Sequence, residues 1–233
     1  MQGSLLINFV GMKITVLVEN SVCKINKSED GLSLYIELEE QKIVFDSGQS
    51  DLFIHNAVKM GIDLTLVDYL VISHGHFEQG GGLNHFLKIN KKAKIFLHIK
   101  AAYKYYTSIF GFIPYNEGLE NNIPQNNRIN FIKEDTQIDD KIILLEGFPE
   151  VFDHPGEDKE IFEKTNNPVS DKFNHQLAMM LIENDEIVLF SGCSHSGIIN
   201  IIEEVKLFSK TMRIKATFGN KILTLKTGEI IEI

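Results

Sequence analysis

Two short apolar runs, each ending in a glycine-flanked loop that carries histidine, constrain the fold of this chain most strongly. Residues 67–72 are almost entirely apolar and stop at Ser73-His74-Gly75-His76. Residues 186–190 form a second such run, followed by Ser191-Gly192-Cys193-Ser194-His195-Ser196-Gly197. Apolar runs of this length are typical of strands that are buried on both faces. We therefore expect each histidine loop to follow a buried strand and to lead into a helix.

The residue types in these loops indicate a metal site. His74 and His76 flank a glycine, so both imidazoles can point at one centre. Zinc binds three or four nitrogen, sulfur or oxygen ligands, and a catalytic zinc keeps one position for water. The histidine pair alone is equally consistent with two surface residues on a loop. His195 is the candidate third ligand, and Cys193 is either a further ligand or a small buried residue.

The rest of the chain predicts layered sheets with helices. The expected hairpin covers residues 32–38 and 42–45, and a helix covers 50–60, with Ser50 as its N-cap and Gly61 at its end. We expect further strands at 12–18, 94–99, 129–132, 141–145, 176–182 and 186–190, helices at 101–108 and 197–208, loops at 111–128 and 153–172, and short strands over 214–233. Two groups of strands, each followed by helices, predict an α/β (α+β) sandwich.

Length and composition exclude several classes of function. The 233 residues suit one domain, which we expect at 12–233 after an N-terminal extension at 1–11. A net charge of −9 argues against a nucleic-acid partner, because backbone binding needs Lys and Arg. The apolar stretch at 5–18 is too short to cross a membrane. Two cysteines, Cys23 and Cys193, form no disulfide framework, which favours the cytoplasm. None of these patterns bears on oligomeric state.

Several motifs occur in an order that resembles the metallo-β-lactamase superfamily. They are Val16-Leu17-Val18-Glu19-Asn20, Gly31-Leu32-Ser33, Phe45-Asp46-Ser47-Gly48-Gln49-Ser50, Ser73-His74-Gly75-His76 with Gly81-Gly82-Leu83, and Gly192-Cys193-Ser194-His195-Ser196-Gly197-Ile198. The resemblance spans Met12 to about Asn200 and is best to the branch of archaeal dihydropterin ribofuranosyl-aminobenzene phosphate synthase-like proteins. It implies a four-layer αββα sandwich with the metal site at one edge of the sheets. It also implies a metal-dependent hydrolase, usually with two metals.

The chain departs from the family pattern in half of that site. The family motif is His-x-His-x-Asp-His, whereas Glu78 stands at the aspartate and Gln79 at the last histidine. Glutamate is one methylene longer, and a glutamine carbonyl is a poor substitute for imidazole on zinc. The family's late histidine is also missing, because no histidine follows His195. The resemblance therefore retains His74, His76 and His195 for a first metal and none of the usual ligands of a second.

Two functional hypotheses remain open from the sequence. In the first, one divalent metal, zinc by ligand type, binds His74, His76 and His195, and Glu78 is a ligand or the general base. Such an enzyme would hydrolyse a small anionic or phosphorylated metabolite. In the second, the site binds no catalytic metal and the chain is a degenerate, non-catalytic binding protein on the same fold.

Other residues are candidates for supporting roles. The resemblance implies that Asp46 holds the loops beside the metal by hydrogen bonds. His175 stands where relatives often have an acidic residue, and His175 or His154 could replace a lost ligand. Gln79 and Cys193 are further candidates near the metal. His98 is expected to be a core or rim histidine. The cluster of Tyr103, Tyr105 and Tyr106 either packs at the surface or forms a wall of the substrate pocket.

Overall fold

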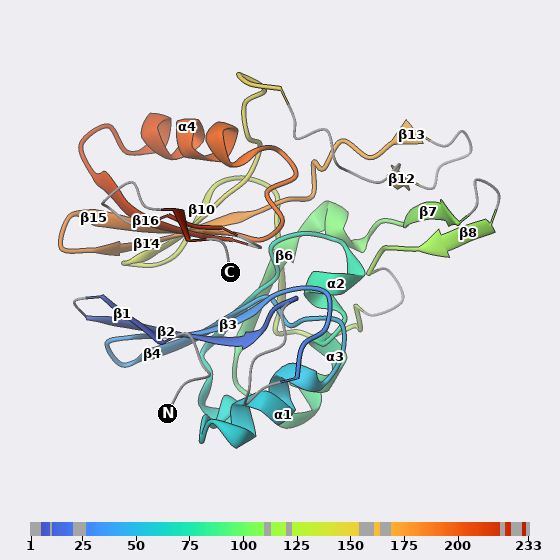
Figure 1. Ribbon diagram of the computed structural model, residues 1–233, viewed down its shortest axis with the longest axis horizontal. Coiled ribbons are helices and arrows are strands. Elements are labelled where there is room, and N and C mark those ends of the chain that lie inside the picture. Colours follow the sequence, from blue (N-terminus) through green and yellow to red (C-terminus); the bar gives the residue numbers. More distant parts are fainter. Residues whose placement is uncertain are drawn as a thin grey trace.

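Two sheets of seven strands face each other, and a smaller four-stranded sheet projects from one end (Figure 1). The computed structural model describes residues 6–9, 11–20, 27–109, 113–119, 123–153, 161–163, 169–219, 222–224 and 230–231. Cys23 and His154 lie outside the described residues.

The first sheet has the strand order β1-β2-β3-β4-β5-β6-β9. Its strands are β1 (Leu6–Phe9), β2 (Met12–Val18), β3 (Ser33–Leu38), β4 (Gln41–Phe45), β5 (Tyr69–Val71), β6 (Lys94–His98) and β9 (Ile129–Ile132). The predicted hairpin is β3 and β4, which pair antiparallel. From β4 onward the strands run parallel. Residues 6–9, which we assigned to an N-terminal extension, continue this sheet by pairing with β2.

The second sheet has the order β10-β11-β14-β15-β16-β17-β18. Its strands are β10 (Thr136–Asp139), β11 (Ile142–Leu145), β14 (Ala178–Glu183), β15 (Glu186–Ser191), β16 (Arg213–Gly219), β17 (Ile222–Thr224) and β18 (Ile230–Ile231). Strand β15 is fully buried from Ile187 to Ser191, as its apolar sequence predicts. It lies between antiparallel β14 and parallel β16.

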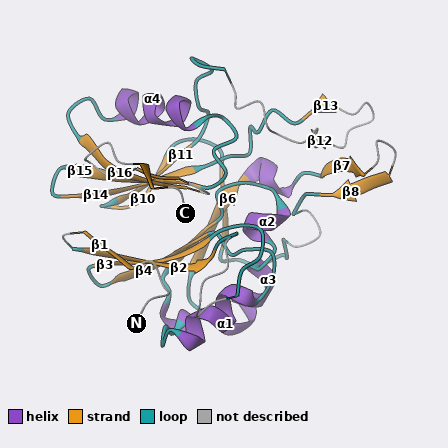
Figure 2. Ribbon diagram, viewed as in Figure 1, coloured by secondary structure: helices purple, strands orange, loops and turns teal. Residues whose placement is uncertain are grey.

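Helices cover the outer face of each sheet (Figure 2). Helices α1 (Leu52–Lys59) and α3 (Leu83–Ile89) pack on the first sheet through buried Phe53 and Phe86. Helix α4 (Ile198–Phe208) packs on the second sheet through Ile201 and Val205. The remaining core lies between the two sheets, where the Phe45 and Phe190 ring centroids are 5.9 Å apart. The layers are therefore helix, sheet, sheet and helix, as predicted.

Buried aromatic side chains hold these layers together. Phe45, Phe53, Phe86 and Phe190 are each fully buried. Full burial of one such side chain contributes about 1.5–3 kcal/mol relative to exposure. The core thus gives both histidine loops rigid strands to extend from.

The predicted helix at 101–108 is wrong. A short 3₁₀ helix, η2 (Ile99–Ala102), is followed by strand β7 (Tyr105–Ile109). The run Tyr-Tyr-Thr-Ser-Ile is aromatic and β-branched, which favours a strand once a partner strand is present. Strand β7 pairs with β8 (Ile113–Asn116) on one side and β12 (Ile161–Glu163) on the other.

Two regions predicted as loops contribute strands to the projecting sheet. Its order is β13-β12-β7-β8, with β13 at Val169–Ser170. Strand β8 comes from the expected loop at 111–128, and β12 and β13 come from the expected loop at 153–172. These strands are short, and β8 is exposed along its length, so their sequences lack the apolar pattern of buried strands.

Two short helical segments complete the described elements, η1 (Leu64–Leu66) and α2 (Phe77–Gly80), which lies inside the first histidine loop. The helix predicted at 50–60 is α1. The N-cap of α1 is Asp51 and not Ser50 as predicted, although the Ser50 hydroxyl accepts a hydrogen bond from the Leu52 N–H at 3.1 Å. Gly61 adopts φ +72° after the helix ends. Within the described residues, no helix is long and apolar enough to cross a membrane.

Candidate metal centre

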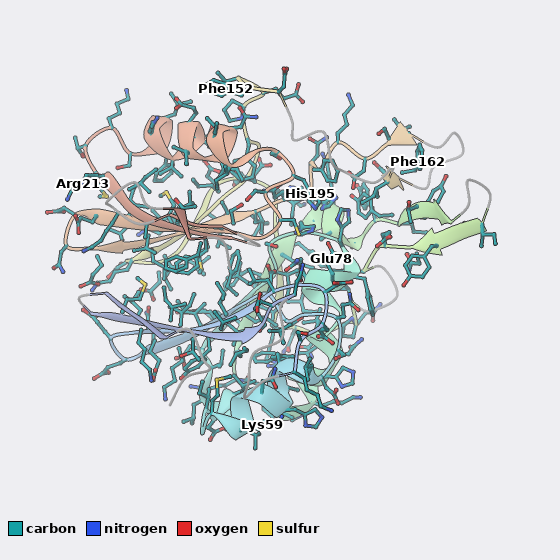
Figure 3. All side chains as sticks on the ribbon, in the orientation of Figure 1. Lys59, Glu78, Phe152, Phe162, His195 and Arg213 are labelled. Atoms are coloured by element: carbon teal, nitrogen blue, oxygen red, sulfur yellow. The ribbon has the colours of Figure 1, made fainter. Side chains whose placement is uncertain are left out.

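The two histidine loops meet at one edge of the facing sheets. Figure 3 shows Glu78, from the first loop, and His195, from the second, close to each other at this edge. The loops approach so closely that a Cβ atom on Gly192 would lie 2.2 Å from Ser73 Oγ. On the other side, a Cβ atom on Gly31 would lie 1.9 Å from the Glu78 carbonyl oxygen. Glycine is thus required at both positions for the backbones to pack.

The loop after β4 supports the first histidine loop. Asp46 is fully buried at φ +59°, and its Oδ1 accepts a hydrogen bond from the Ser73 backbone N–H at 2.6 Å. The Ser47 backbone N–H donates to the Gln79 carbonyl at 2.7 Å. Burial raises the pKa of Asp46 well above its usual range. Asp46 and Ser47 therefore fix the two ends of the segment from His74 to Gln79.

A first cluster of ligand atoms comes from both loops. His74, Glu78, Cys193 and His195 each offer one such atom, and these four atoms lie within 4.8 Å of one another. His74 Nδ1 lies 3.0 Å from Ser73 Oγ, and its Nε2 lies 3.4 Å from Glu78 Oε1. Among the described residues, the fully buried His74 Nε2 has no hydrogen-bond partner. Leaving a buried polar atom unsatisfied costs about 1–3 kcal/mol, so this nitrogen suits a metal.

His76 adds a further nitrogen to this cluster. Its Nδ1 lies 3.7 Å from Glu78 Oε1. The ring centroid of His76 is 4.7 Å from that of His74 and 5.1 Å from that of His195. The His74 and His195 centroids are 4.9 Å apart. The three histidines and Glu78 named from the sequence therefore lie together in the structure. Three nitrogens and a carboxylate oxygen are a donor set that divalent zinc accepts.

A second cluster consists of His76, Asp171 and His175, whose candidate ligand atoms also lie within 4.8 Å of one another. The Nε2 atoms of His76 and His175 lie 3.0 Å and 2.9 Å from Asp171 Oδ2. The Gly75 backbone N–H donates to His175 Nδ1 at 2.9 Å. Because a backbone N–H can only donate, His175 Nδ1 carries the lone pair and Nε2 carries the proton. His175 is therefore a hydrogen-bond donor to Asp171.

This tautomer is incompatible with a metal on His175 Nε2. Ligation there would require the imidazole proton on Nδ1, where it would face the Gly75 N–H. The hydrogen bonds of His175 favour a supporting role over the role of replacement ligand, and His175 lies beside the candidate ligand His76. Asp171 was missed in the sequence because it sits in a polar segment that we expected to be a loop.

Burial and charge set the protonation states of the two clusters. Burial lowers the pKa of His74 to about 3 and the pKa of His175 to about 4. Burial would also lower the pKa of His76, but its hydrogen bond to Asp171 and the nearby carboxylates raise it. Burial would raise the pKa of Glu78, yet contacts with His74 and His76 hold it below its usual range. His74 is therefore neutral near pH 7, as a metal ligand must be.

Gln79 occupies the position where the resemblance expects a second-metal histidine. Its side chain is fully buried, and its Nε2 donates to Cys193 Sγ at 3.2 Å. Cys193 Sγ lies 3.8 Å from Glu78 Oε1. These two residues, which the sequence named as candidates near the metal, are thus in contact with each other and with the first cluster.

The remaining candidates lie outside the ligand clusters or beside them. His98 Nδ1 accepts a hydrogen bond from the Lys100 N–H, and its Nε2 lies 3.6 Å from Glu146. Tyr103 is exposed, whereas Tyr105 is buried with its ring centroid 4.3 Å from that of His175. Tyr105 therefore packs against the second cluster.

Phe173 is a second residue that the sequence did not reveal. Its ring stacks on His195 with centroids 4.3 Å apart and an interplanar angle of 7°. It adopts φ +55°, a conformation that costs a non-glycine residue about 1–2 kcal/mol. No local pattern in the sequence signals this contact, because it depends on how distant segments pack.

The chain is similar in sequence to two proteins of one archaeon. The chain is 29% identical over 207 residues to the uncharacterized protein MJ0448 of Methanocaldococcus jannaschii, covering 88% of this chain and 77% of that protein. It is 25% identical over 211 residues to the 7,8-dihydropterin-6-methyl-4-(beta-D-ribofuranosyl)-aminobenzene-5'-phosphate synthase of the same organism, covering 82% of this chain and 70% of the synthase.

A solved structure shares the fold. It is the crystal structure of Tm1679, described as a metal-dependent hydrolase of the beta-lactamase superfamily. It superposes with a TM-score of 0.72 at 28% identity and covers 89% of this chain and 75% of that chain. The family model for the metallo-beta-lactamase superfamily matches residues 29–211. The sandwich, the histidine loops at its edge and this match together establish that the chain belongs to the metallo-β-lactamase superfamily.

Proposed function

We propose that this chain is a metal-dependent hydrolase that binds one divalent metal ion, zinc by ligand type. The observation that carries the proposal is the buried Nε2 of His74, which lacks a hydrogen-bond partner among the described residues and lies 3.4 Å from Glu78 Oε1. His76 Nδ1 lies 3.7 Å from the same oxygen. The donors of the site are then His74, His76 and His195, with Glu78 as a further ligand or as the general base.

The hydrogen bonds around the site support one metal rather than two. A second metal in the usual place would need a ligand at Gln79, whose amide nitrogen instead donates to Cys193 at 3.2 Å. No histidine follows His195 in the sequence to supply the family's late ligand. Asp171 and His175 could offer other metal-binding atoms, but His175 Nε2 is hydrogen-bonded to Asp171 Oδ2 and His175 Nδ1 accepts from the Gly75 N–H.

Glu78 and Asp46 have different roles in the proposed reaction. When bound, a divalent metal lowers the pKa of a coordinated water to about 7, which makes hydroxide available near neutral pH. Glu78 is negatively charged at this pH, so its carboxylate is suited both to ligate and to accept the proton of the attacking water. Asp46 supports the ligands by holding the Ser73 backbone at the start of the loop.

The proposed substrate is a small anionic or phosphorylated metabolite. Support comes from the synthase that is 25% identical to this chain, because its name specifies a phosphate-bearing compound. The acidic chain, with net charge −9, fits neither a nucleic-acid partner nor an anionic membrane surface. With no disulfide framework in the sequence, we place the enzyme in the cytoplasm.

Metal content tests the proposal directly. The chain is loaded with zinc, manganese or iron, dialysed, and its metal per chain is counted beside that of His76→Ala and His85→Ala. We expect one equivalent in the wild type, loss in His76→Ala, and no change in His85→Ala, whose imidazole is 41% exposed. Failure of the wild type to retain any of the three metals would refute the proposal.

A second experiment assigns the role of Glu78. Glu78→Gln keeps an oxygen that can ligate but cannot accept a proton at neutral pH. With p-nitrophenyl phosphate esters as probes, we expect kcat to fall by about 100-fold or more while the metal content stays near one. Unchanged kcat in this variant would exclude Glu78 as the proton acceptor.

The alternative function is a binding protein on a degenerate site. The contact between Gln79 and Cys193 favours it, because Gln79 stands where the family motif has a histidine ligand and its amide is hydrogen-bonded to Cys193. A chain that takes up no metal, or takes it up without hydrolysing any phosphate or carboxylate ester, would favour this alternative. Binding of small anions would then be measured by calorimetry on the metal-free chain.

A further inference from the structure

We propose that Asp171 is a positioning residue for His76, holding its imidazole proton on Nε2 so that Nδ1 presents its lone pair to the metal centre. Asp171 lies in the segment 171–177, between β13 and β14, far from His76 in the sequence. The metal in this statement rests on the proposed function. The proton positions belong to the chain itself and can be measured without metal.

The proton assignment starts at the backbone of Gly75. Its N–H donates to His175 Nδ1 at 2.9 Å, so this nitrogen carries the lone pair. The proton of the neutral His175 ring is therefore on Nε2, which lies 2.9 Å from Asp171 Oδ2. Thus one backbone hydrogen bond fixes the direction of the whole series.

Asp171 passes this constraint to His76. Its Oδ1 accepts from the Phe173 backbone N–H at 2.8 Å, and its Oδ2 accepts from His175. The same Oδ2 lies 3.0 Å from His76 Nε2. An ionised carboxylate can only accept, so His76 Nε2 must carry a proton. Because the Asp171 side chain is only 3% exposed, water does not compete for these contacts.

His76 Nδ1 is then the nitrogen that faces the metal ligands. It lies 3.7 Å from Glu78 Oε1, within the first cluster. A carboxylate behind a ligating imidazole fixes the ring and makes its metal-facing nitrogen more basic. Asp171 therefore acts on the site through His76, without contributing a ligand of its own.

The same segment also contacts the third imidazole and the first loop. Phe173 stacks on His195 with ring centroids 4.3 Å apart. The Leu177 N–H donates to the Ser73 carbonyl at 2.6 Å. Segment 171–177 thus fixes the surroundings of two of the three proposed histidine ligands, which favours a positioning role over a chance contact.

Nitrogen NMR of the histidine rings tests the proton positions. In the metal-free wild type, at a pH where the His76 ring is titrated to its neutral form, we expect His76 and His175 both to carry the proton on Nε2. In Asp171→Asn, the amide N–H must face one of the groups that donate to Asp171, namely His76 Nε2, His175 Nε2 and the Phe173 backbone N–H. We therefore expect the His76 tautomer to change. Zinc affinity should fall about 10–100-fold. Asp139→Asn, the same change on β10, should alter neither measurement.

A pair of variants at position 175 separates positioning from ligation. A glutamine can accept from Gly75 through its carbonyl and donate to Asp171 through its amide, so His175→Gln should keep the His76 tautomer and near wild-type zinc affinity. His175→Leu removes both hydrogen bonds and should weaken zinc binding. This comparison also covers the case in which Asp171→Asn does not fold.

Two results would overturn the proposal. One is a wild-type His76 with its proton on Nδ1. The other is loss of zinc from His175→Gln as complete as that from His76→Ala, because His175 would then be a ligand. If no variant or wild type binds metal while His76 carries its proton on Nε2, the proposed function fails and the positioning role of Asp171 stands.

Discussion

Two clusters of potential metal ligands lie side by side in this protein, and His76 of the second contacts Glu78 of the first. Their hydrogen bonds differ. In the first, His74 Nε2 is buried and unsatisfied within the described structure, and it lies 3.4 Å from Glu78. In the second, both imidazoles donate to Asp171, and His175 accepts from Gly75. In the first cluster, a buried imidazole nitrogen lacks a hydrogen-bond partner among the described residues, whereas both ring nitrogens of His175 in the second cluster are hydrogen-bonded.

Hydrogen bonds separate candidate metal ligands from the residues that position them. Histidine and carboxylate side chains within 4.8 Å of one another occur in both clusters, so proximity alone does not identify a metal site. The hydrogen bonds of the imidazoles do distinguish the two clusters, because a backbone N–H beside a ring nitrogen fixes which nitrogen holds the proton. This criterion favours the first cluster as the proposed metal site and the second as its support.

Removing a ligand of the first cluster should have the largest effect. We expect His74→Ala to abolish zinc binding, because His74 Nε2 is fully buried beside Glu78 and has no hydrogen-bond partner among the described residues. The matched control is His98→Ala, which removes another buried imidazole, one that contacts Lys100 and Glu146 and lies in neither cluster. Metal per chain after dialysis checks both variants. Equal zinc in His74→Ala and the wild type would erase the distinction between the clusters.

Filling the space between the two loops should have the next largest effect. In Gly192→Ala, the new Cβ atom would lie 2.2 Å from Ser73 Oγ, so the loop that carries His195 must move. We expect a loss of about 1–3 kcal/mol in the free energy of unfolding and weaker zinc binding. Urea denaturation and calorimetric titration measure the two effects.

Gly147→Ala is the control for this variant. Gly147 has φ +70° with nothing within 4 Å of a new Cβ atom, so the substitution adds backbone strain without a clash. It should destabilise the chain by about 1–2 kcal/mol while leaving zinc affinity unchanged. If both glycine variants changed zinc affinity equally, the close approach of the loops would not be what assembles the site.

Restoring the family residue at position 79 should have a smaller effect. We expect Gln79→His to bind one metal per chain, as the wild type does, because no histidine follows His195 to complete a second site. Loss of the hydrogen bond to Cys193 should cost about 0.5–1.5 kcal/mol of stability. Metal counting and thermal denaturation are the measurements. A stoichiometry of two would show that the single substitution had been the only barrier to a second metal.

The sequence predicted the parts of this fold that follow a local rule. The buried strand β15, the hairpin of β3 and β4, and helix α4 each show the periodicity of their structure. The ligand candidates His74, His76 and His195 also follow a local rule, because each sits in a glycine-flanked loop after a buried strand. The structure brings these three together.

Features that depend on contacts between distant segments could not be predicted in this way. Strand β7 was assigned to a helix, because the local pattern reveals neither its pairing with the exposed β8 nor its pairing with β12, which lies more than fifty residues away. Asp171 lies 95 residues from His76, in a segment whose polar composition indicates only a loop. The tautomer of His175 depends on a backbone atom 100 residues away. Such features follow from packing, which local patterns do not encode.

The smallest effect should come from Cys193, which lies at the edge of the first cluster. Its Sγ accepts a hydrogen bond from Gln79 at 3.2 Å and is 3.8 Å from Glu78. The proposed metal site, with its three histidines and Glu78, does not need this sulfur as a ligand. We therefore expect Cys193→Ser to change zinc affinity less than tenfold. With cobalt in place of zinc, the wild type should show no thiolate-to-cobalt charge-transfer band. Such a band, lost in Cys193→Ser, would show that the Cys193 sulfur is a metal ligand and would favour it over His76 in the ligand set.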